Sequence, residues 1–129
     1  MTFARLQAAL AARPPGPDPT ARILPAHVPP GGFRAASVLV PLHEKGGQPH
    51  VLVTLRPATM RRHAGQISLP GGALDHGEES LQAALREAHE EVGLDRRQVT
   101  VLGRLSDVVV LTSPFRLTPW VGSVPYPSP

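Results

Sequence analysis

Three glutamates lie close together in the chain, at Glu87, Glu90 and Glu91. Separations of three and four residues bring their side chains to one face of a helix, where the carboxylates converge. Like charges repel, and the negative end of the helix dipole is near, so the group needs a cation to stabilise it. Oxygen ligands in a chain without cysteine favour Mg²⁺ or Mn²⁺ over zinc. An ordinary exposed acidic helix face is the alternative interpretation.

The helix that would carry these glutamates is predicted for residues 80–92. Ser80 is a typical N-cap residue, and Gly93 suits the left-handed position that follows a helix. Arg86 precedes Glu90 by one helical turn, so we expect an ion pair that holds this carboxylate in one orientation. Small or apolar residues in an arc of about 100° predict the face that packs on a sheet. These residues are Leu81, Ala84, Leu85, Ala88 and Val92.

Two adjacent glycines, Gly71 and Gly72, precede this helix in the segment LPGGALDHGEES. Residues without a Cβ let the backbone turn tightly and leave its carbonyl groups able to reach an ion. We therefore expect a glycine-rich loop before the helix, which adds backbone oxygen to the carboxylates. Paired glycines before a helix are common, so the feature supports a metal site without establishing it.

The other predicted elements place this helix on a sheet. Short β-branched runs predict strands, and the Gly-Gly signal between the first two predicts a hairpin. The predicted strands cover residues 35–42, 50–56, 66–69, 99–105, 108–111 and 117–124. A helix is expected at residues 3–12, followed by an irregular Pro- and Gly-rich segment over residues 13–32. This order of elements predicts an α+β fold with a mixed sheet.

The composition is that of one globular domain, since 129 residues supply one hydrophobic core and not two. The absence of cysteine excludes disulfides, thiolate nucleophiles and zinc–sulfur sites. No apolar run approaches the roughly 20 residues that span a bilayer. Residues 1–12 lack the continuous apolar core of a secretory signal. We therefore expect a cytoplasmic protein that does not bind membranes.

The formal net charge of +3 is compatible with a basic nucleic-acid binder. Proteins that bind single strands stack the bases on aromatic side chains. This chain has one Trp, one Tyr and three Phe, too few for such a platform. We therefore expect a small-molecule substrate and no nucleic-acid partner.

The segment from Gly72 to Leu94 resembles the Nudix box of the Nudix hydrolases. This box reads Gly, five residues, Glu, seven residues, Arg-Glu, an apolar residue, any residue, Glu-Glu, any residue, Gly and an apolar residue. Every fixed position is matched, with Ala88 a small choice for its apolar position. The resemblance implies an α+β Nudix fold, in which a strand–loop–helix–loop motif holds a divalent metal, Mg²⁺ or Mn²⁺, on a mixed sheet.

Position in the box implies a role for each matching residue. The implied metal ligands are the carboxylates of Glu87, Glu90 and Glu91 and the backbone carbonyl of Gly71. The implied catalytic residues are Arg86, Glu87 and Glu90. Glu90 corresponds either to a third ligand or to the group that activates water. Glu78 and Arg86 correspond to residues that support the ligands.

The segment LVTLRPATMRRHAGQISLPGG, residues 52–72, resembles the extended motif of the coenzyme A diphosphatases within the Nudix group. The positions in register are Thr54, Arg56, Arg61, Gly65, Pro70, Gly71 and Gly72. The sequence departs from the motif at Val53, Pro57 and Leu69. Pro57 stands where the motif has a serine, so the hydroxyl is missing there. The implied substrate contacts are Arg56, Arg61, Gly65 and Gly72. Guanidinium groups bind phosphate oxygens in pairs, but a basic loop that pairs with the acidic helix is the alternative.

The two motifs together imply hydrolysis of coenzyme A to 4′-phosphopantetheine and adenosine 3′,5′-bisphosphate. A rival within the enzymes is a Nudix hydrolase of another nucleoside diphosphate derivative: ADP-ribose, a dinucleotide or an oxidised nucleotide. A rival of a different class is a non-catalytic nucleotide-binding Nudix module. The intact box glutamates argue against that module, whereas the short C-terminus argues for it.

We expect an N-terminal short helix and proline-rich arm over residues 1–32 and a Nudix domain over residues 33–129. The family resemblance runs from about Phe33 to Val124. Family members continue with a strand and a closing helix, which the final VPYPSP cannot supply. The C-terminal part of the fold is therefore expected to be short or missing. The explanations are a truncated product and a cover supplied by a partner subunit, since family members are often homodimers.

Overall fold

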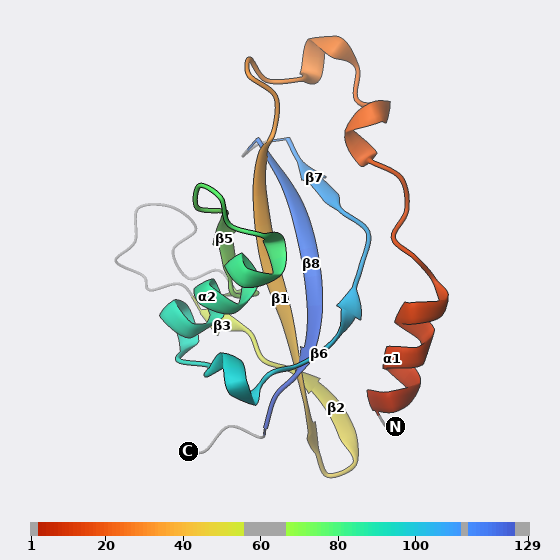
Figure 1. Cartoon of the computed structure of the whole chain (residues 1–129), viewed down its shortest axis with the longest axis vertical. Helices are drawn as coiled ribbons and strands as arrows, with labels where there is room; N and C mark the ends of the chain where they lie inside the picture. The colour runs from red at the N-terminus through yellow and green to blue at the C-terminus, as the bar shows by residue number, and fades with distance from the viewer. Residues whose placement is uncertain (1–2, 56–66, 112–113, 126–129) are drawn as a thin grey trace.

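A mixed sheet of six strands forms the centre of the computed structural model, which describes residues 3–55, 67–111 and 114–125 (Figure 1). Its strands are β1 (Arg34–Lys45), β2 (Gln48–Val51), β5 (Gly71–Ala73), β6 (Thr100–Arg104), β7 (Val108–Val110) and β8 (Phe115–Ser123). β1 pairs parallel with β8, whereas the pairs β1–β2, β1–β5, β6–β8 and β7–β8 are antiparallel. The short strands β3 (Thr54–Leu55) and β4 (Ile67–Ser68) pair separately. The predicted mixed α+β fold is confirmed.

Two α-helices of the described residues flank this sheet (Figure 1). α2 (Ser80–Val92) packs on β1 and β5, and α1 (Phe3–Ala12) packs on β6. The short 3-10 turns are η1 (Pro19–Arg22), η2 (Pro25–His27) and η3 (Arg96–Gln98). Both α-helices lie where the sequence predicts them. Within the described ranges, no helix has the length and apolar character needed to cross a membrane.

α2 packs on the sheet through its smallest side chains. Ala83, Ala84 and Ala88 are completely buried, and Ala84 and Ala88 belong to one cluster with Leu39 of β1. Alanine side chains let the helix come close to the strands, and burial of their apolar surface stabilises the contact. The predicted docking face is confirmed at Ala84 and Ala88. The buried face of α2 is wider than the predicted one, because it also includes Ala83.

The two ends of α2 are defined by local hydrogen bonds. Glu79 is the N-cap, and its N–H donates to the side-chain oxygen of Gln82 at 3.1 Å. The prediction of Ser80 as the cap is wrong, because Ser80 begins the helix and its hydroxyl accepts a hydrogen bond from the indole of Trp120 at 3.0 Å. Gly93 follows the helix with a φ of 72°, which confirms the predicted left-handed position.

The predicted strand over residues 50–56 is divided in two. β2 ends at Val51, although the Leu52 N–H still donates to the Pro41 carbonyl at 2.9 Å. The chain then leaves β1, and Thr54 of β3 pairs with Ser68 of β4. A run of β-branched residues predicts extended backbone but cannot say which neighbour it will pair with.

Residues Gly71–Ala73 form strand β5 and not the predicted glycine-rich loop. The register places Gly71 opposite Val38 of β1 and Ala73 opposite Ala36. A Cβ on Gly71 would lie 2.4 Å from the carbonyl oxygen of Ser37. Glycine is therefore required here because the two backbones approach closely, and not because the chain turns.

Candidate active site on α2 and β5

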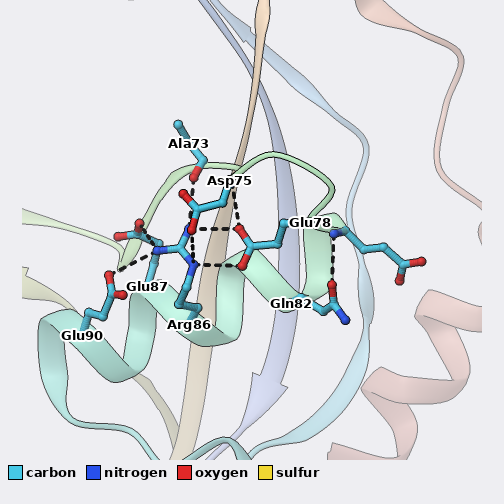
Figure 2. Close-up of polar contacts among 8 residues, drawn as sticks. Ala73, Asp75, Glu78, Gln82, Arg86, Glu87 and Glu90 are labelled. Atoms are coloured by element: carbon cyan, nitrogen blue, oxygen red, sulfur yellow. Dashed lines mark hydrogen bonds and ion pairs between the residues drawn. The ribbon is translucent and has the colours of Figure 1, made fainter.

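Arg86 lies at the centre of a polar network between α2 and the loop that precedes it (Figure 2). Its Nε and Nη2 donate to the two carboxylate oxygens of Glu78 at 2.8 and 3.0 Å. Nη2 also donates to the carbonyl of Ala73 at 3.2 Å. Nη1 donates to Glu87 at 2.9 Å and to Glu90 at 3.2 Å, so the predicted Arg86–Glu90 pair is confirmed. All five N–H groups of the guanidinium are used, which fixes its orientation.

The carboxylates around Arg86 carry more charge than it can balance. Besides Glu78, Glu87 and Glu90, the carboxylate of Asp75 lies 3.4 Å from Nε of Arg86. Within this network of described residues, one guanidinium charge faces four carboxylate charges, so the network itself has a net negative charge. The site therefore favours a bound cation over an anion.

The Arg86 guanidinium holds the pKa of Glu78 well below its usual value, from 4.5 to about 2. A hydrogen bond from the backbone N–H of Asp75, at 2.9 Å, lowers the pKa further. Both contacts stabilise the charged form of the carboxylate. Hydrogen bonds to Glu78 also raise the pKa of Arg86. The pair therefore stays charged throughout the neutral pH range.

This low pKa predicts how Glu78 contributes to stability as the pH changes. Because the pKa is depressed in the folded state, the contribution is complete above pH 4.5 and is lost as the pH falls toward 2. Glu78→Gln removes the charge at every pH. The difference in the free energy of unfolding between the native chain and Glu78→Gln should be largest near neutral pH and should shrink on acidification. Urea denaturation over a pH series, in a metal chelator, measures this difference.

Glu44→Gln is the matched control for this measurement. Glu44 is exposed near the hairpin end of β1, so its replacement should leave the pH dependence of stability unchanged. A difference between the native chain and Glu78→Gln that is the same at every pH would contradict the depressed pKa.

Glu91 connects the last turn of α2 to β5. Its Oε2 accepts a hydrogen bond from the N–H of Gly71 at 3.1 Å. The preceding carbonyl, of Pro70, bonds to Leu39 of β1 at 2.9 Å. Successive residues of an antiparallel strand direct their N–H and C=O groups to alternate sides. The Gly71 carbonyl therefore points away from β1, to the side on which Glu91 contacts the strand.

Gly72 provides the space in which the Glu87 carboxylate lies. A Cβ on Gly72 would be 2.8 Å from Cδ of Glu87. The Glu87 side chain is largely buried, with 17% of its surface exposed. A larger residue at position 72 would displace this carboxylate from β5 and from its contact with Arg86.

The predicted convergence of the three glutamates is only partly present. Glu87 and Glu90 share Nη1 of Arg86, whereas Glu91 contacts the Gly71 N–H. Among the residues that the structure describes, no three carboxylate or imidazole side chains form a group that could hold a metal ion. The physical reason is that like charges repel, and Glu91 finds a separate donor in the Gly71 N–H, away from the Arg86 guanidinium.

Three predicted substrate contacts, Arg56, Arg61 and Gly65, lie outside the described residues and stay predictions. The strands on either side of them are described. The Thr54 hydroxyl lies 3.1 Å from the carbonyl of Ser68 and donates to it. β3 and β4 therefore hold the two ends of this segment together, immediately before β5.

Two contributors to the site are absent from the predicted set. The backbone N–H and carbonyl of Asp75 both bond to Glu78, and the turn between them ends at Gly77 with a φ of 76°. Trp120 of β8 donates to Ser80 and packs against the core below α2. The sequence does contain a signal for each of these two residues. Asp75 stands three residues before Glu78, and Trp120 is the one tryptophan of the chain and lies in a predicted strand.

Comparison with known proteins agrees with this arrangement. Residues 33–124 match the NUDIX domain family. The chain is 47% identical over 100 residues to the uncharacterized Nudix hydrolase NudL of Klebsiella aerogenes, covering 77% of this chain and 82% of that protein. It is 48% identical over 93 residues to NudL of Cronobacter sakazakii, covering 71% of this chain and 47% of that protein.

A solved structure shows the same fold. The Nudix hydrolase RenU of M. smegmatis superposes with a TM-score of 0.60 at 30% identity, over 73% of this chain and 63% of RenU. The chain spans about half the length of the NudL protein from Cronobacter. The domain match extends over more than two thirds of the chain and includes β1, β5, α2 and β8. This chain therefore belongs to the Nudix hydrolase family.

Proposed function

We propose that the protein hydrolyses the diphosphate linkage of coenzyme A, in a reaction that depends on Mg²⁺ or Mn²⁺. The products would be 4′-phosphopantetheine and adenosine 3′,5′-bisphosphate. The observation that carries this proposal is the network in which one saturated guanidinium holds Glu78, Glu87 and Glu90 at the end of β5. Such a network places carboxylates precisely and leaves an excess of negative charge beside them.

The residues fit a divalent cation in donor chemistry and in charge. Glu87, Glu90 and Glu91 would supply carboxylate oxygens, and the Gly71 carbonyl faces the same side of β5. Hard oxygen donors are the ligands that Mg²⁺ and Mn²⁺ prefer. When bound, the ion would supply a counter-charge for the diphosphate and a water of lowered pKa.

Each side chain of the network has its own proposed role. Arg86 orients Glu87 and Glu90, and the bidentate contact with Glu78 keeps the guanidinium from turning. Glu90 is more than half exposed, at 55%, and its Oε2 accepts a hydrogen bond from Arg86 at 3.2 Å. It is therefore the group best placed to accept a proton from the attacking water. Gly72 keeps the backbone of β5 close to Glu87.

The assignment to coenzyme A depends on the segment before β5. Arg56 and Arg61 would bind phosphate oxygens, and Gly65 would let the backbone approach the substrate. Coenzyme A carries a 3′-phosphate besides its diphosphate, so it presents more anionic groups than ADP-ribose. Two arginines in this segment would match this higher charge.

A substrate panel with mass-resolved products tests the proposal. We expect the 129-residue chain to convert coenzyme A with Mg²⁺ or Mn²⁺ to the two named products, and to act more slowly on 3′-dephospho-coenzyme A. ADP-ribose, a dinucleotide and an oxidised nucleotide complete the panel. A higher kcat/KM for any of these three would refute the coenzyme A assignment. Nucleotide binding without turnover on any substrate would instead indicate a non-catalytic module.

A further inference from the structure

A hollow lies between the N-terminal segment and the end of β6, away from the residues of the α2–β5 site. This hollow, the arm groove, has a volume of about 330 Å³. One wall consists of Leu6, Leu10 and Arg13 with the prolines that follow them, and the other includes Arg104 and Ser106. The volume is at the lower end of the range for small-molecule sites.

The walls of the arm groove are held in place by specific contacts. The Gly16 N–H donates to the Ser106 hydroxyl at 2.8 Å. Gly103 of β6 has no Cβ, and a Cβ there would lie 2.8 Å from Cβ of Leu10, so α1 packs directly on the strand. Arg116 of β8 lies 3.0 Å from the carboxylate of Asp18 and ties the segment after α1 to the sheet.

The polar groups that line the arm groove are donors. Arg13 and Arg104 are positively charged, and no acidic residue lines the hollow among the described residues. The Ser106 oxygen accepts the bond from Gly16, which leaves its own O–H as a donor. Three donors beside an apolar wall are suited to an anion that also has an apolar part.

The nearest carboxylate, that of Asp107, is shared between Arg104 and Arg116. Arg116 holds one oxygen of Asp107 with a hydrogen bond of 2.7 Å. Nη2 of Arg104 lies 3.6 Å from the other oxygen, too far for a hydrogen bond. Nε of Arg104 is buried and has no acceptor in the described part of the chain. The Asp107 carboxylate is therefore shared between two guanidinium groups and balances only part of the charge of Arg104.

We propose that the arm groove binds a phosphate monoester with a short apolar chain. The phosphate would lie between Arg13 and Arg104 and accept a hydrogen bond from the Ser106 hydroxyl. The apolar chain would lie against Leu6 and Leu10. This site is separate from α2 and β5, so the inference does not depend on the proposed hydrolysis of coenzyme A.

Titration of the ¹⁵N-labelled full chain with hexyl phosphate, in a metal chelator, tests the proposal. We expect saturable shifts of the amide signals of Gly16, Leu105 and Ser106. Arg13→Gln should weaken binding at least about tenfold, because it removes a charged donor. Arg5→Gln makes the same change of charge on α1, outside the groove, and should change the affinity less than about twofold. Inorganic phosphate and hexanol should each bind at least about tenfold more weakly.

Each other outcome overturns the proposal. Shifts concentrated at Gly71 and Gly72 would place the ligand at the α2 site. Equal losses in Arg13→Gln and Arg5→Gln would mean a general effect of charge. Hexanol binding as tightly as hexyl phosphate would show an apolar hollow without anion recognition, and a titration without saturation would show no site. Turnover of coenzyme A does not enter any of these readouts.

Discussion

Glu91→Gln is expected to reduce metal-dependent kcat/KM for coenzyme A at least about a thousandfold, because an uncharged amide is a poor ligand for a divalent cation. The fold should be retained. The Gln amide oxygen can still accept the hydrogen bond that Gly71 N–H now donates to Glu91 at 3.1 Å. Steady-state rates over a range of Mn²⁺ concentrations, with thermal unfolding of the same samples, measure the two effects.

Glu44→Gln makes the same chemical change on the exposed end of β1 and should leave the rate unchanged. Metal affinity gives a second readout for the proposed ligand. Mn²⁺ binding, followed by the electron spin resonance of the unbound ion, should be weaker in Glu91→Gln and normal in Glu44→Gln. Near-normal activity in Glu91→Gln would contradict the assignment of Glu91 as a metal ligand.

Gly71→Ala is expected to have the largest effect on stability, with a loss of about 3 kcal/mol in the free energy of unfolding. The added Cβ would lie 2.4 Å from the Ser37 carbonyl oxygen and 2.5 Å from Cγ1 of Val38. The first contact is with backbone, so no change of rotamer relieves it. β5 would have to move from β1, and its contact with Glu91 would move with it. Urea denaturation measures the loss, and the turnover assay should show reduced activity in the fraction that folds.

Gly46→Ala separates this steric effect from the general cost of replacing glycine. Gly46 has a φ of 61° in the β1–β2 turn, and a Cβ there would meet no atom within 4 Å. Its cost should be limited to about 1–2 kcal/mol for the left-handed backbone. If Gly71→Ala lowered the free energy of unfolding no more than Gly46→Ala does, the close packing of β5 on β1 would be contradicted.

Local patterns predicted most of the elements because their causes are local. The apolar spacing of residues 80–92 and the left-handed preference of Gly93 placed α2 at its observed bounds. The same patterns did not predict that residues 50–56 divide between β2 and β3, or that Gly71–Ala73 form a strand. Both depend on which distant strand each segment meets. Ser80 was assigned as the cap on propensity, but Trp120 engages its hydroxyl from across the sheet.

The sequence by itself determined which residues share a face of α2, since helical geometry places Arg86, Glu87, Glu90 and Glu91 together over little more than one turn. Only the tertiary structure decided where each carboxylate points. β5 pairs with β1 beside α2, and this brings Ala73 and Glu78 to Arg86 and Gly71 to Glu91. The reason is physical: a carboxylate turns to the nearest donor, and these donors come from segments that meet only when the sheet has formed.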